Sequence, residues 1–128
     1  KTYTRLLNSV KDRIRKAQYD ALKTVNKELI DLYGDIGRII VERQEKEGWG
    51  KSVVEKLAAD LQKECPGIQG FSAQNLWRMK QFYQAYAGKE KLSPLVREIG
   101  WTHNIIILQC KDDLQREFYI RMTIPLKG

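Results

Sequence analysis

The sequence predicts an all-α fold, in which a long N-terminal helix leads into a helix-turn-helix-like helical bundle. Three observations predict it: apolar residues recur at three- and four-residue spacing, glycines and prolines fall between the periodic segments, and no segment alternates apolar and polar residues as a strand would. The 128 residues are 42% hydrophobic, which is enough for one compact core. We therefore expect a single helical domain over residues 1–128.

The first element is expected to be a long basic helix over residues 1–47. Its apolar residues follow one another at spacings of 3, 4, 3, 4, 4, 4, 3, 4 and 3, a heptad pattern with one stutter. Gly34 and Gly37 each cost a helix about 1 kcal/mol relative to Ala, so a kink or break there is plausible and continuity past them is left open. We call this pattern the heptad seam, and its members are Leu7, Val10, Ile14, Ala17, Ala21, Val25, Leu29, Leu32, Ile36 and Ile39.

The heptad seam has two alternative roles. Either it forms a dimer interface, or it folds back over the rest of the domain. Heptad spacing flanked by Lys and Arg favours the dimer, whereas the stutter and the two glycines favour folding back. We favour a homodimer, whose candidate interface residues are Leu7, Val10, Ile14, Ala17 and Ala21.

The second element, residues 52–87, is expected to be the helix-turn-helix-like unit. Ser52 and Glu55 have capping-box spacing at the start of its first helix, which Pro66 would stop. Ser72 is a suitable N-cap for its second helix, which Gly88 would close. The turn PGIQGF is longer than that of a tight helix-turn-helix, so the unit would be a variant. The expected core residues are Val54, Leu57, Ala58 and Leu61 in the first helix and Leu76, Met79, Phe82, Tyr83 and Tyr86 in the second.

The last part of the chain, residues 92–124, is expected to add C-terminal helices. A short helix falls near 95–99, another starts at 101–102, and a third covers 112–124. His103, the sole histidine, would lie in the first turn of a helix capped by Thr102. It has no second histidine or cysteine close in sequence, so we do not expect it to bind a metal. Cys65 and Cys110 have no CxxC spacing, so by default they pack in the core.

The second helix of the 52–87 unit carries a polar row opposite its apolar face. Arg78 can fork onto guanine, Gln74 and Gln81 suit adenine, and Lys80 suits phosphate. Trp77 projects with this row, so it must cover a neighbouring segment or meet a partner. A solvated row with Trp77 packed under another helix is the simpler interpretation of one amphipathic helix. Two capped helices joined by a turn favour a recognition helix that enters the major groove of duplex DNA.

The net charge of +7 gathers in two parts of the chain. Residues 1–27 hold eight Lys and Arg against two acids, a net +6, and residues 66–97 hold five against one, a net +4. Residues 28–65, with six against nine, carry −3. This distribution is typical of a polyanion binder, although a surplus of lysine also serves solubility. Lys11, Arg15 and Lys51 are the candidate phosphate contacts.

The residues offer no catalytic chemistry. The chain contains no Pro-Asp dipeptide and no Asp-x-Lys or Glu-x-Lys, the signature with which a PD-(D/E)XK nuclease holds its metal ions and stabilises charge. Asp112, Asp113 and Glu117 are expected at a helix start because of the helix dipole. We assign no catalytic residue, metal ligand or cofactor, and expect that this chain is not an enzyme.

The cellular setting is expected to be the cytoplasm. The longest aliphatic run, IIIL at 105–108, is far shorter than the roughly 20 apolar residues of a membrane span. Two isolated cysteines fit a reducing compartment. The chain starts at Lys1, without Met or a signal-peptide pattern, so we expect a piece of a longer protein.

Five landmarks come in order along the chain, GWG, PGIQGFS, NLWRM, FY and WTHN. Together with LSPLVREIGWTHNIIIL and KDDLQREFYIRMT, they resemble the N-terminal domain of YhcG-type proteins, a bacterial family of PD-(D/E)XK nucleases. The resemblance implies a helical, DNA-binding module ahead of a nuclease domain, with the recognition helix at Gln74, Asn75, Trp77 and Arg78. The chain departs from the family at Gly34, commonly aromatic, at Cys65, commonly Phe, and at IPLKG, beyond which family members continue.

Two functions are compatible with the sequence. The first is a DNA-binding N-terminal module that directs the C-terminal nuclease domain of its parent protein to duplex DNA. The alternative is a helical oligomerisation or protein-interaction module that makes no direct DNA contact. Salt separates the two, because phosphate contacts lose affinity steeply with added salt and a helical seam does not.

Overall fold

The computed structural model describes residues 2–48, 50 and 52–124, and every regular element in these residues is a helix. The predicted all-α fold with a long N-terminal helix is therefore confirmed. The helices are α1 (Thr2–Glu47), α2 (Ser52–Glu64), α3 (Ala73–Tyr86), α4 (Ser93–Val96), α5 (Trp101–Ile107) and α6 (Asp113–Thr123).

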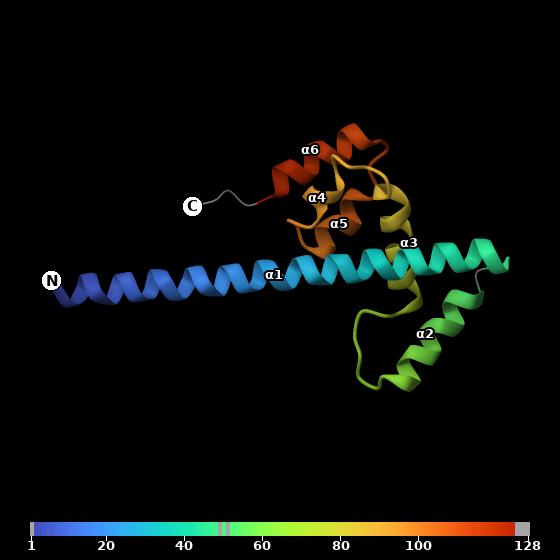
Figure 1. Cartoon of the computed structure of the whole chain (residues 1–128), viewed down its shortest axis with the longest axis horizontal. Helices are drawn as coiled ribbons and strands as arrows, with labels where there is room; N and C mark the ends of the chain where they lie inside the picture. Colours follow the sequence, from blue (N-terminus) through green and yellow to red (C-terminus); the bar gives the residue numbers. More distant parts are fainter. Residues whose placement is uncertain (1, 49, 51, 125–128) are drawn as a thin grey trace.

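The long helix α1 runs unbroken for 46 residues, and its N-terminal half extends beyond the rest of the molecule (Figure 1). Its buried residues all lie in the C-terminal half, at Ile30, Tyr33, Gly37 and Ile40. Neither glycine breaks the helix. Gly37 lies where α3 crosses, and a Cβ there would sit 2.7 Å from the carbonyl carbon of Met79. The absence of a side chain thus lets the two helix backbones approach closely.

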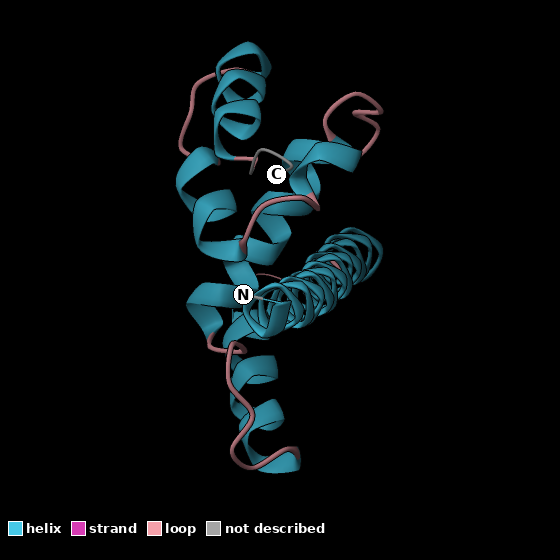
Figure 2. Cartoon of the chain, turned by 90° about the vertical axis from the view of Figure 1, so that its left-hand side faces the viewer, coloured by secondary structure: helices cyan, strands magenta, loops and turns pink. Residues whose placement is uncertain are grey.

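The crossing of α1 and α3 organises the whole fold. One end of the molecule holds α2 and the other holds α4, α5 and α6, with α1 passing between them (Figure 1). Figure 2, which views α1 nearly end-on, shows the same arrangement. Trp101 packs against both core clusters, with its ring centroid 4.7 Å from that of Tyr33 and 5.4 Å from that of Phe82. The first cluster is Ile30, Phe82, Tyr86, Leu92, Val96, Ile99, Ile107 and Ile120, and the second is Tyr33, Ile40, Val54, Ala58, Leu76 and Met79.

The expected core faces of α2 and α3 are largely confirmed. Val54 and Ala58 are buried in α2, and Leu76, Met79, Phe82 and Tyr86 are buried in α3. The remaining expected core residues, Leu57, Leu61 and Tyr83, are half-buried. The prediction for Cys65 is wrong: the thiol is exposed, because α2 ends at Glu64 and the chain turns away from the core.

The helix ends agree with the sequence signals in most places. The Ser72 hydroxyl accepts a hydrogen bond from the Asn75 N–H at 3.2 Å, as expected of an N-cap, and Gly88 follows α3 with φ of 76°. The short α4 begins at Ser93, two residues before the expected start. The expected cap at Thr102 is wrong, because α5 already starts at Trp101, and Gly100, two residues before Thr102, occupies the cap position. His103 does lie in the first turn of α5.

Polar contacts fasten the C-terminal helices to α1. The Asn26 amide donates hydrogen bonds to the carbonyl oxygens of Arg97 (3.1 Å) and Ile99 (2.8 Å). Glu98 accepts ion pairs from Lys23 (3.6 Å) and Lys27 (3.4 Å). Lys16 also pairs, with Asp20 of its own helix at 2.9 Å, so three of the eight cations expected to attract a polyanion form ion pairs within the chain.

Candidate nucleic-acid interface

The start of α3 is held by Asn75, one of the residues predicted from the sequence to contact DNA. The Asn75 amide donates to the carbonyl oxygen of Gly70 at 2.6 Å and accepts from the indole N–H of Trp101 at 2.9 Å. Gly70 has φ of 89°, which favours glycine, and its backbone lies against the Tyr33 hydroxyl. Asn75 therefore joins the turn, α3 and α5, and its hydrogen-bonding groups face the protein.

The outer face of α3 remains polar and accessible between its neighbours. Gln74, Gln81 and Gln84 are exposed there. Arg78 is half-buried at the edge that faces α5. The structure thus brings Gln74, Arg78 and Gln81 onto one face of α3, as the helical spacing predicts.

A groove of about 470 Å³ lies beside this face, between α3 and the helices α5 and α6. It is lined by Arg78, Gln81, Gln84, Ala85, Ile105, Leu108, Gln109 and Arg116. Arg116 is occupied within the protein, because its guanidinium binds the Asp113 carboxylate at 3.1 Å and the carbonyl oxygen of Cys110 at 3.1 Å. Among the described residues, Arg78 makes no ion pair. Of the two cations that line the groove, Arg78 is thus the one that no described acid pairs.

Trp77 lies at the opposite edge of the α3 face. Its indole is half-buried and packs against the second core cluster, and the Lys80 ammonium lies 4.9 Å from the ring centroid. A cation at this distance is attracted to the ring face. Trp77 thus covers a neighbouring segment, one of its two expected roles, and Lys80 lies over it.

The other candidate contacts are far from α3. Lys11 and Arg15 are exposed on the projecting half of α1. Arg15 lies 22 residues before Gly37, the point where α3 crosses, which is about 33 Å along the helix axis at 1.5 Å per residue. Within one chain, these residues and Arg78 therefore do not form one patch. Lys51 lies outside the described residues.

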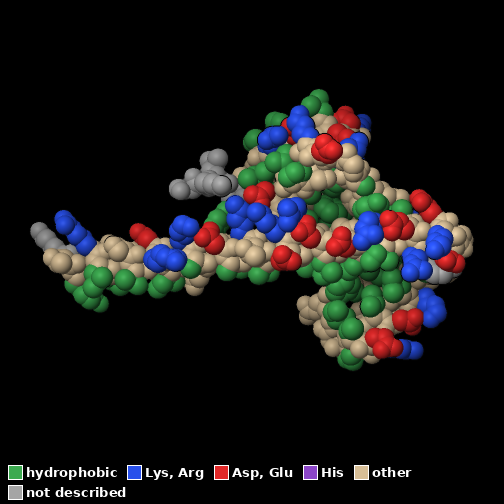
Figure 3. All heavy atoms as spheres, in the orientation of Figure 1, with side chains coloured by type: hydrophobic (Ala, Val, Ile, Leu, Met, Phe, Trp, Pro, Cys, Tyr) green, Lys and Arg blue, Asp and Glu red, His purple; other side chains and the backbone are tan. Residues whose placement is uncertain are grey.

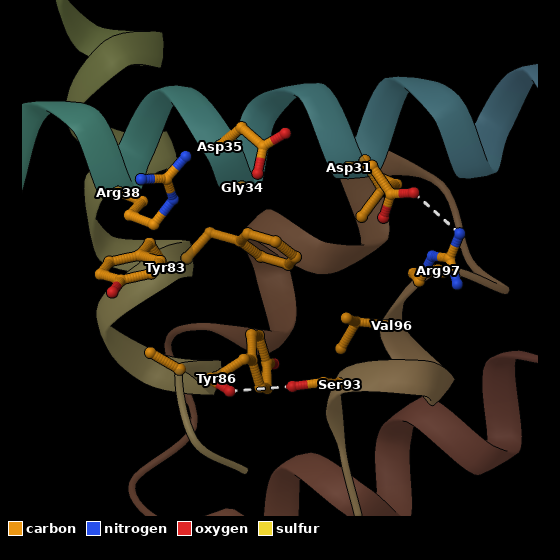
Figure 4. A pocket seen from close by; sticks show the side chains of 12 residues that line it. Asp31, Gly34, Asp35, Arg38, Tyr83, Tyr86, Ser93, Val96 and Arg97 are labelled. Atoms are coloured by element: carbon orange, nitrogen blue, oxygen red, sulfur yellow. Dashed lines mark hydrogen bonds and ion pairs between the residues drawn. The ribbon is translucent and has the colours of Figure 1, made fainter. Parts of the chain in front are cut away.

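A second hollow of about 460 Å³, between α1, α3 and α4, was not foreseen from the sequence (Figure 4). Gly34 and Phe82 line it together with charged residues of both signs. Asp31 binds Arg97 at 2.7 Å, and Asp35 and Arg38 add one charge of each sign. Since two acids balance two cations, this hollow is a poor site for a polyanion, whereas the lining of the α3–α5 groove includes no acid.

Tyr86 reaches from α3 into the first core cluster. Its hydroxyl is buried without a hydrogen-bond partner in the described structure, and burial raises its pKa to about 12. The pKa of the Tyr33 hydroxyl is also raised by burial. Both groups stay protonated near neutral pH and serve packing.

Two of the three acids expected at a helix start do lie there, Asp112 as the N-cap and Asp113 in the first turn of α6, whereas Glu117 lies one turn later. The Asp112 carboxylate caps α6 by accepting from the Gln115 N–H at 2.9 Å. A hydrogen bond from Lys89 lowers the pKa of Asp113, and hydrogen bonds from Arg121 and Lys91 lower the pKa of Glu117. In the described part of the chain, no group of three His, Cys, Asp or Glu side chains could hold a metal ion. None of the helices described is long and apolar enough to cross a membrane.

Comparison with known proteins gives one match. Residues 9–127 match the family model described as DUF1016 N-terminal domain, which agrees with the resemblance found in the sequence motifs. Searches of curated proteins and of solved structures find no match.

Proposed function

The chain belongs to the family of DUF1016 N-terminal domains, and we propose that it is a DNA-binding module of helix-turn-helix-like type. The observation that carries the proposal is the guanidinium of Arg78, which pairs with no acid in the described part of the chain and lies on a polar, accessible face of α3. Arg, flanked by Gln74 and Gln81, supplies the donors that read base edges in the major groove. In helix-turn-helix proteins, the N-terminal residues of the second helix make these contacts.

The parent protein would use this module to bring a nuclease domain to duplex DNA. Support comes from the sequence motifs that resemble YhcG-type proteins, while the family match supports only that the chain is an N-terminal domain. The chain itself supplies binding and no catalysis in this proposal. Two unpaired cysteines suit a reducing cytoplasmic setting.

Arg78→Ala tests the proposal when it is compared with a matched control. The control is Arg38→Ala, which removes the same charge from an exposed side chain of α1 that pairs with Glu42 at 3.2 Å. Binding to a fluorescent duplex is measured by anisotropy at several salt concentrations. Arg78→Ala should weaken binding by about 1–3 kcal/mol, or roughly 5- to 150-fold. Arg38→Ala should change it by less than about threefold.

Two outcomes count against the proposal. If the two variants lost equal affinity for the duplex, the loss would be explained by net charge alone. If the natural chain bound no duplex at low salt, DNA would not be its ligand. A second candidate function, a helical protein-interaction module, would then take its place. The observation that favours that candidate is the exposed heptad seam of α1.

A further inference from the structure

The heptad seam and the core lie on different faces of α1. At about 100° per residue, the seam is centred roughly 130° around the helix from the buried face of Ile30, Tyr33, Gly37 and Ile40. Most of the seam therefore does not fold back over the domain, one of the two roles considered, although Ile36 is half-buried and packs against the second core cluster. Figure 3 shows hydrophobic side chains along one edge of the projecting half of α1. The large seam residues Leu7, Val10, Ile14, Val25, Leu29, Leu32 and Ile39 are 36% to 62% exposed.

The order of spacings in the seam is a palindrome. The series 3, 4, 3, 4, 4, 4, 3, 4, 3 is the same in both directions, and its centre is Lys23. A second copy running antiparallel about this centre therefore meets every seam residue with another seam residue. The pairs are Leu7 with Ile39, Val10 with Ile36, Ile14 with Leu32, Ala17 with Leu29, and Ala21 with Val25.

We propose that the chain forms an antiparallel homodimer through the heptad seam, centred on Lys23. In a parallel pair, Ala17 and Ala21 would each face the same alanine of the second copy, and the small side chains would fill these layers poorly. In the antiparallel pair, each Ala faces a larger side chain. This match resembles the complementary packing of knobs and holes in coiled coils.

Charge also favours the antiparallel direction. Before Lys23, α1 holds five Lys and Arg against two acids, a net +3; after Lys23 it holds four against six, a net −2. A parallel pair would place basic half against basic half. In the antiparallel register, Arg13 lies level with residue 33 of the second copy, between that copy's Asp31 and Asp35. On the helical wheel, all three lie on one flank of the seam, and like flanks face each other in this geometry.

An apolar hollow receives the end of the second copy. It has a volume of about 230 Å³, lies between α1 and α2, and joins the seam at Ile39. In the proposed register, Tyr3 and Leu7 of the second copy lie opposite residues 43 and 39, beside this hollow. Both side chains are exposed in the single chain, Tyr3 by 71%. The lining residues are Ile39, Ile40, Arg43, Gln44, Val53, Val54 and Leu57.

The dimer also unites the two separated sets of DNA-contact candidates, a consequence that rests on the proposed function. Lys11 of the second copy falls level with residue 35 and its Arg15 with residue 31. These levels are about 3 Å and 9 Å along the axis from Gly37, where α3 crosses. Lys11 and Arg15 lie on the flank of the seam that also carries α3. Phosphate contacts would thus lie beside the α3 of the other copy.

Cysteine cross-linking between two differently marked chains tests the direction. In a background in which both native cysteines are serine, a Leu7→Cys chain is mixed with an Ile39→Cys chain and oxidised. The antiparallel dimer yields the mixed cross-link and almost no Leu7→Cys homodimer, since those positions are about 48 Å apart. A cross-linked Leu7→Cys homodimer, or a dimer without the mixed cross-link, overturns the proposal.

The mass of the unmodified chain tests the association itself. Sedimentation equilibrium should give a dimer, and Ile14→Asp should give a monomer with unchanged helicity by circular dichroism. Leu114→Asp is the control, because Leu114 is also an exposed apolar residue but lies on α6; this variant should stay dimeric. A monomeric natural chain at high concentration overturns the proposal. A cross-linked dimer that binds no duplex would refute the DNA-binding function and leave the pairing intact.

Discussion

The crossing of α1 and α3 at Gly37 gives the sharpest prediction for stability. Gly37→Ala should destabilise the protein although alanine is the better helix former. The helix gains about 1 kcal/mol from the substitution. The added Cβ, however, would lie 2.7 Å from the Met79 carbonyl carbon and 3.0 Å from the Tyr83 Cβ. Ordinary carbon contacts are about 3.5–4.0 Å, so α3 must move away from α1.

The size of the effect follows from what has to move. Overpacking a core typically costs about 1–3 kcal/mol, and the obstacle here is backbone, so we expect the upper end of that range. After the helix gain, the net loss is about 2 kcal/mol. Gly34→Ala is the matched control one turn earlier, where the nearest atom is Phe82 Cε2 at 3.6 Å. It should stabilise the protein by about 1 kcal/mol.

Urea unfolding, followed by circular dichroism at one protein concentration, measures both variants. Their difference of about 3 kcal/mol corresponds to roughly 1–3 M in the urea midpoint, given slopes of about 1–3 kcal/mol per M. Gly37→Ala unfolding at or above the natural midpoint would refute the close crossing. Destabilisation of equal size in Gly34→Ala would show that α1 resists any added side chain there.

Three further predictions concern side chains of the core and of α6. Tyr86→Phe should keep or slightly raise stability at neutral pH, because no described residue hydrogen-bonds the buried hydroxyl. It should also reduce the loss of stability expected of the natural protein between about pH 10, the unfolded pKa of tyrosine, and about pH 12, the pKa of Tyr86 in the fold. Unfolding curves and tyrosinate absorbance measure both effects. Trp77→Ala should lower the unfolding midpoint because the indole packs on the second cluster; an unchanged midpoint with lost DNA binding would make it a contact residue instead. The pKa values of Asp113 and Glu117 are lowered in the fold, so stability should fall as the pH drops through about 4. The Asp113→Asn variant should lose less stability over this pH range. Urea midpoints measured at several pH values test both expectations.

Periodicity predicts much of this fold because it encodes which face of a helix is buried. The stripes of α2 and α3 and the caps at Ser72 and Asp112 follow from local sequence alone. Two periodic patterns on one helix are harder to interpret. The seam residues dominate the pattern of α1, yet the core takes Ile30, Tyr33 and Ile40 on another face, where Gly37 contributes no apolar side chain.

Polar contacts between residues far apart in the sequence could not be predicted from local sequence patterns. Asn75 and Asn26 are ordinary polar residues in the sequence, and only the fold brings them to Trp101 and to the 97–99 carbonyl groups. The buried Asn104, whose amide donates to the Val96 carbonyl at 3.1 Å, is a similar case. The WTHN landmark contains both Trp101 and Asn104, so it could have pointed to a structural role. The polar row of α3 could be predicted because all its members belong to one helix, whose periodicity places them on the same face.

The two proposed functional surfaces, the seam of α1 and the outer face of α3, can be separated by experiment because they lie on different helices. Ile14→Asp acts on the seam and leaves α3 untouched, while Arg78→Ala acts on α3 and leaves the seam untouched. If both surfaces serve DNA binding, Ile14→Asp should lower the salt dependence as well as the affinity, since Lys11 and Arg15 of the second copy would no longer lie beside α3. Arg78→Ala should lower affinity in the dimer while the mass stays unchanged. An Ile14→Asp monomer that binds duplex with full affinity and the natural salt slope would show that α3 acts alone.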